Sequence, residues 1–175
     1  PAHLFRVLPS AGTAALFSAL LLQACAGRGH RTEEPPGEVL VRAENALAAE
    51  DLDQAWSLLD ALDAGALRPR ELEKHLFLEA RAHYLEGEGW RSFQKLEALA
   101  SKFPVTAFAP QAAWMEFQIG KALLDSRSGF LGLFSDRGYG LRVLKHLVIH
   151  YRDQTEPDRP GNVLADDALA LIGQV

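Results

Sequence analysis

The sequence has little of what several classes of protein require. It contains one cysteine in 175 residues, which excludes an intramolecular disulfide and a cysteine-rich zinc site. Lysine and arginine (18) are fewer than aspartate and glutamate (23), and the formal net charge of -5 argues against a nucleic-acid binder, because phosphate contacts need clustered cations. Valine, isoleucine and threonine are scarce beside alanine and leucine, which favours helix over strand.

The first apolar run is a candidate targeting segment. Residues 10–24 carry no charge, but the run is shorter than the roughly 20 residues of a transmembrane helix and is typical of a signal peptide. It ends in Leu22-Gln23-Ala24-Cys25, which resembles the lipobox of bacterial lipoproteins. The resemblance implies that a signal peptidase recognises Leu22 and Ala24 and that Cys25 is lipidated. Palmitate or a similar fatty acid would then anchor the chain. The alternative is an ordinary signal peptide with a chance cysteine.

These features predict three regions. A lipoprotein signal peptide occupies residues 1–24, and a lipidated cysteine with a flexible tether occupies 25–37, which is rich in glycine, proline and charge. A helical domain is predicted from 38 to 175. Its apolar residues recur at spacings of three and four, which predicts helices near 38–48, 52–62, 72–85, 90–103, 108–124, 141–151 and 163–172. Short loops between them favour antiparallel neighbours.

The helical hairpins repeat along the chain. Leu52, Ala55 and Leu58 match Trp90, Phe93 and Leu96 at a constant offset, and a longer offset relates Leu96 and Leu99 to Leu144 and Leu147. We therefore predict an all-α fold, a tetratricopeptide-like α-solenoid of antiparallel hairpins. Trp90 and Phe93 are expected to be buried between hairpins. The residues expected to carry repeat packing are Phe77, Tyr84, Trp90, Phe93 and Leu96. The alternative is a plain helical bundle with accidental self-similarity.

Residues 96–112, LEALASKFPVTAFAPQA, resemble a recurrent element of the outer-membrane assembly lipoproteins of the BamD (YfiO, ComL) type, F-x-x-L-x-x-x-Y-P-x-S-x-x-A-x-x-A. A second copy begins at Leu144 and resumes at Val163, with Arg152 in place of the proline. The family usually has about five such repeats where this chain has about three. The resemblance therefore leaves open that the chain is a fragment.

The resemblance implies a non-catalytic scaffold without a cofactor, held by its lipid at the periplasmic face of the outer membrane. Its implied partners are subunits of the β-barrel assembly machine and unfolded outer-membrane protein clients. Another periplasmic repeat adaptor is the open alternative: a pilotin-like factor for secretion or pilus assembly, or a coordinator of cell-wall synthesis.

Residues 126–140 are unusual because glycine alternates with large apolar residues between two predicted helices. The segment is interpreted as a loop. Phe130, Leu131, Leu133 and Phe134 either cover the helical core or contact a partner or membrane, and the covering role is favoured.

Other polar groups are interpreted as structural. His146 and His150 stand four apart, a spacing that can bind a metal, but two surface histidines are expected instead. His75 and His83 are equally uninformative, and Asp166-Asp167 is read as a pair of first-turn acids. No phosphate-binding loop or nucleophile elbow is present in the sequence, so we predict no enzymatic activity and no metal site.

Overall fold

The computed structural model describes residues 34–126, 136–152 and 160–175. The chain divides into two units, residues 1–34 and 35–175, and the helices described below belong to the second. The lipobox residues Leu22, Ala24 and Cys25 lie outside the described residues, as do the four loop residues Phe130, Leu131, Leu133 and Phe134. The described residues form helices and no strand, so the predicted all-α class is confirmed.

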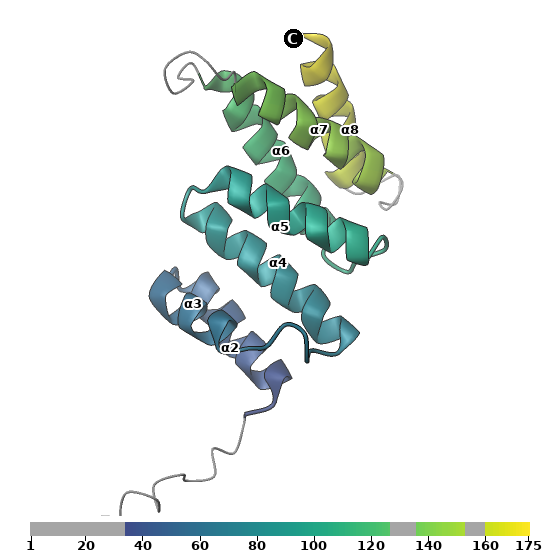
Figure 1. Cartoon of the computed structure of the whole chain (residues 1–175). Coiled ribbons are helices and arrows are strands. Elements are labelled where there is room, and N and C mark those ends of the chain that lie inside the picture. Colours follow the sequence, from purple (N-terminus) through teal and green to yellow (C-terminus); the bar gives the residue numbers. More distant parts are fainter. Residues whose placement is uncertain (1–33, 127–135, 153–159) are drawn as a thin grey trace, which may run out of the picture. The chain divides into compact units, whose positions relative to one another are not determined.

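The helices contact one another mainly in sequential pairs (Figure 1). They are α2 (Pro36–Ala48), α3 (Leu52–Asp60), α4 (Pro69–Leu85), α5 (Gly89–Lys102), α6 (Ala109–Asp125), α7 (Asp136–Tyr151) and α8 (Pro160–Gly173). The closest partners are α2 with α3, α4 with α5, α6 with α7, and α7 with α8. Further contacts join α2 and α3 to α4, α5 to α6 and α7, and α6 to α8. Each pair therefore packs on the next along the chain.

Local sequence signals explain where the helices begin. Asp51 caps α3 by accepting a hydrogen bond from the Gln54 backbone N–H at 3.0 Å. Proline stands in the first turn of α2, α4 and α6, where its missing N–H costs nothing. Helix α2 starts at Pro36, two residues before the predicted boundary, and α8 starts at Pro160 rather than near 163.

Two further boundaries differ from the prediction. Helix α3 ends at Asp60, before Leu62, which instead packs on the core from the following loop. Helix α7 begins at Asp136, so residues 136–140 are helical rather than part of a loop. The glycines that argued against a helix there have a packing role, because a Cβ on Gly140 would lie 2.9 Å from the Gly120 carbonyl oxygen. Helices α6 and α7 approach closely at this pair.

The core runs through all the pairs and contains most of the predicted repeat residues. Phe77, Phe93 and Leu96 are buried, and Leu99, Leu144 and Leu147 are fully inaccessible. The expectation for Trp90 was wrong. Its side chain is only half-buried, between Phe93 and Tyr139, with the Arg142 guanidinium 5.5 Å from its ring centre. Tyr84 is also half-buried.

Within the described residues, no helix is both long and apolar enough to cross a bilayer.

Candidate functional site: a groove between α4 and α6

A groove of about 670 Å³ lies between α4 and α6. The described residues that line it belong to α2, α4, α6 or α8 or directly precede α6, and none of them comes from α3, α5 or α7. The lining residues are Glu44, Phe77, Arg81, Tyr84, Leu85, Phe108, Pro110, Gln111, Trp114, Met115 and Leu164. One member of each helical pair thus contributes to a common surface.

Aromatic rings form the walls of this groove. Phe77 of α4 stacks on Phe108, with ring centres 4.3 Å apart and planes 8° from parallel. Tyr84 meets Trp114 of α6 edge-on at 5.7 Å. The Trp114 side chain stays 47% exposed and Leu85 is also exposed, although both are large and apolar. Large exposed apolar groups in a concave site favour the binding of another apolar surface.

The groove also holds a half-buried cation. Among the described residues, Arg81 forms no hydrogen bond or ion pair. The carboxylate of Glu44, which also lines the groove, forms an ion pair with Lys74 at 2.6 Å. Lys95 and Arg91, two other cations near α4, have carboxylate partners. A guanidinium with five donors beside apolar walls is suited to a carboxylate that arrives from elsewhere.

A polar contact joins α4 to the start of α6. The Glu73 carboxylate of α4 accepts hydrogen bonds from the Thr106 hydroxyl at 2.6 Å and the Ala107 N–H at 3.0 Å. Thr106 is buried, and its Oγ1 accepts from the Phe108 N–H at 3.2 Å. These bonds satisfy backbone groups just before α6 and fix the position of Phe108 on Phe77. The sequence pattern had not indicated Glu73.

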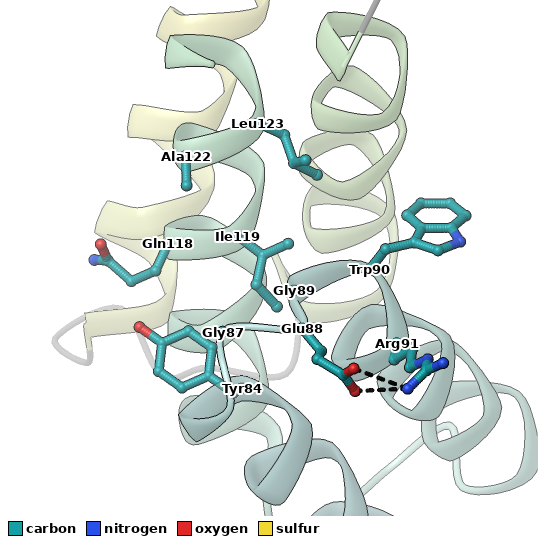
Figure 2. A pocket seen from close by; sticks show the side chains of 10 residues that line it. All are labelled: Tyr84, Gly87, Glu88, Gly89, Trp90, Arg91, Gln118, Ile119, Ala122 and Leu123. Atoms are coloured by element: carbon teal, nitrogen blue, oxygen red, sulfur yellow. Dashed lines mark hydrogen bonds and ion pairs between the residues drawn. The ribbon is translucent and has the colours of Figure 1, made fainter. Parts of the chain in front are cut away.

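A second cavity adjoins the groove and shares Tyr84 with it. This cavity has a volume of about 810 Å³. Figure 2 shows it between the turn that joins α4 to α5 and the C-terminal half of α6. Gly87 has a φ of 77°, which only glycine adopts readily, and it allows the chain to reverse here. Ile119 packs on Gly89, where an added Cβ would lie 3.3 Å from the Ile119 side chain.

The prediction of two surface histidines on α7 was wrong for His146. Its Nδ1 lies 2.9 and 3.0 Å from the two carboxylate oxygens of Glu116 on α6, and the Glu116 side chain is fully buried. Burial raises the pKa of Glu116 to about 7, against the opposing effect of His146. The missed signal was Glu116 itself, a charged residue on the apolar face of α6 between Ala112 and Gly120, because such a position requires a partner.

The remaining polar candidates are dispersed. His75 is buried, with Nε2 3.2 Å from the Leu59 carbonyl oxygen. Asp166 and Asp167 are exposed, and because α8 begins at Pro160 they are not in its first turn, contrary to the prediction. His83 lies beside two glutamates at the end of α4.

Scans of this chain against protein-family models, curated proteins and solved structures found no match.

Proposed function

We propose that the chain is a lipid-anchored periplasmic scaffold built from tetratricopeptide-like hairpins, similar to the BamD-type component of the β-barrel assembly machine. The groove between α4 and α6 would hold a segment of a partner protein. The observation that carries the proposal is this groove, with Trp114 exposed and Arg81 without a partner among the described residues.

The arrangement of the helices supports a repeat architecture. The pairs begin at Pro36, Pro69 and Ala109, and α8 begins at Pro160, so their spacing starts close to the tetratricopeptide length of about 34 residues and then lengthens. Contacts run between neighbouring pairs, as in quasi-one-dimensional folds, where one pair alone cannot bury its apolar face. Repeat folds of this kind use an extended surface made by equivalent helices to bind partners.

The residues that carry the family resemblance have consistent structural roles. Leu96 and Leu99 are fully buried, and the alanines Ala109 and Ala112 are buried where α6 packs on its neighbours. Thr106, at the position of the motif's serine, donates to Glu73 and so attaches the loop to the preceding pair. A motif with these roles supports hairpin stacking. Assignment to the assembly machine rests on the resemblance together with the lipobox.

Site-specific photocrosslinking in the native cells tests the proposal. A benzophenone side chain at position 114 lies in the groove, and one at Ile149 is a matched control, because Ile149 is a 74% exposed apolar residue on α7 away from the groove. We expect position 114, but not 149, to crosslink to the barrel-forming subunit of the assembly machine or to its clients. Crosslinking at 114 to a secretion, pilus or cell-wall protein would favour the alternative adaptor role. Equal crosslinking at both positions would refute the groove as the site.

A further inference from the structure

The turn after α4 brings three potential metal ligands together. Gly87, in the left-handed region, lets the Gly87 N–H reach the Tyr84 carbonyl at 3.0 Å and the Glu88 N–H reach the His83 carbonyl at 2.9 Å. This pair of hydrogen bonds is the Schellman motif, which places the residue after the glycine over the helical residue five positions earlier. Here those two residues are Glu88 and His83, and Glu86 lies between them.

The distances are close to those of a coordination sphere. His83 Nδ1 lies 2.9 Å from Glu88 Oε2 and 3.4 Å from Glu86 Oε2, and the ligand atoms of all three residues lie within 4.8 Å of one another. In a tetrahedral site, donors bonded to one zinc ion at about 2.0–2.2 Å are separated by about 3.3–3.6 Å, so closure on an ion would need only small movements of the three side chains. The side chains are 15–37% exposed, so an ion has access from solvent.

Neighbouring groups hold the two carboxylates in place. The Trp56 indole N–H donates to Glu86 Oε1 at 2.7 Å, which leaves Oε2 directed at His83, and the Trp56 ring packs on the imidazole at 4.7 Å. Arg91 donates to both oxygens of Glu88 and is the main cause of a lowered pKa for that carboxyl. Donors behind ligating carboxylates commonly fix their orientation in metal sites.

The local charge favours a cation. Two carboxylates face one imidazole nitrogen, which can donate a single proton to only one of them. Arg91 offsets one of the two negative charges, but its side chain is 64% exposed and such a surface pair contributes little. The site also lies at the C-terminal end of α4, where the helix dipole stabilises positive charge.

We propose that His83, Glu86 and Glu88 form a binding site for a divalent transition-metal ion, with zinc as the best fit. One imidazole and two carboxylates match the donors that zinc accepts, and the absence of a thiolate or thioether among the three disfavours soft ions such as Cu(I). Glu88 and Arg91 also line the cavity of Figure 2, so a bound ion would stand at its edge. The proposal is independent of the scaffold function.

Calorimetric titration of the full chain with zinc tests the site. Every sample carries Cys25→Ser, because a thiolate would itself bind zinc. We expect one ion per chain in the parent and an affinity at least about 10-fold weaker in His83→Ala and in the isosteric Glu86→Gln.

His150→Ala is the matched control. It removes one of the two neighbouring histidines that stand four residues apart on α7, and it should leave the zinc affinity unchanged. Circular dichroism establishes that the variants are folded, and Glu86→Gln decides the outcome if His83→Ala does not fold. No zinc binding by the parent, unchanged affinity in Glu86→Gln, or loss of binding in His150→Ala would overturn the proposal.

Discussion

Among the described carboxyl groups, that of Glu116 is the most deeply buried. Its carboxyl is fully buried between α6 and α7, and its folded pKa of about 7 lies above the ordinary value of 4.5. An acid with a raised folded pKa binds more protons in the native state than in the unfolded state between these two values. Its contribution to stability is therefore present below about pH 4.5 and is lost as pH rises to about 7.

Glu116→Gln is expected to remove this pH dependence. The variant should resemble the parent near pH 5 and be more stable at pH 8, by about 2–3 kcal/mol, because an amide has no charge to desolvate. Urea unfolding at several pH values measures the difference. A parent whose stability does not fall between pH 5 and 7 relative to Glu116→Gln would contradict the burial argument.

The two aromatic residues at the start of α5 are expected to differ in importance. Phe93 is 0% exposed, so Phe93→Ala should cost about 3–5 kcal/mol of unfolding free energy through the cavity it leaves. Trp90 is half-buried, and Trp90→Ala removes ring contacts with Phe93, Tyr139 and Arg142 at the edge of the core. It should therefore cost clearly less, about 1–2 kcal/mol. The denaturation midpoints of the two variants measure this difference in stability. A Trp90 variant as unstable as the Phe93 variant would refute the ranking.

At the scale of elements, the contact between α6 and α7 depends on two glycines. A Cβ at Gly140 would meet the Gly120 backbone oxygen at 2.9 Å, and backbone cannot rotate away as a side chain can. Gly140→Ala should therefore push α6 and α7 apart and lower the free energy of unfolding by about 1–3 kcal/mol. Gly138→Ala in the same helix meets nothing within 4 Å and should be neutral or stabilising by up to about 1 kcal/mol. Thermal unfolding of both variants tests this, and equal shifts would show that close packing is not the cause.

The sequence predicted the existence and type of most elements because apolar periodicity and capping signals are local. Asp51 before α3 and Gly87 after α4 are local signals of this kind. The start of α7 was missed because local propensity counts Gly138 and Gly140 against a helix, whereas the tertiary contact with Gly120 favours glycine at position 140. The groove and the Glu116–His146 pair join residues 30 or more positions apart, and helical spacing within one segment carries no information about such pairs.

At the scale of the whole molecule, the prediction concerns attachment to a membrane. The lipobox resemblance predicts that Cys25→Ser leaves an uncleaved precursor that incorporates no labelled palmitate, while the parent is labelled. Because Cys25 is the single cysteine in the chain, loss of label has one interpretation. Equal labelling of parent and variant would refute lipidation.

The hydrogen bonds of Glu73 give the groove one fixed edge. They join α4 to the loop before α6 near the starts of both helices, whereas Tyr84 and Leu123, near their far ends, face an open cavity. We therefore expect the groove to widen least near Thr106 and most at the Tyr84 end. The Ala107 amide, hydrogen-bonded at this fixed edge, should exchange its proton with solvent more slowly when a bound segment holds the two helices at one angle.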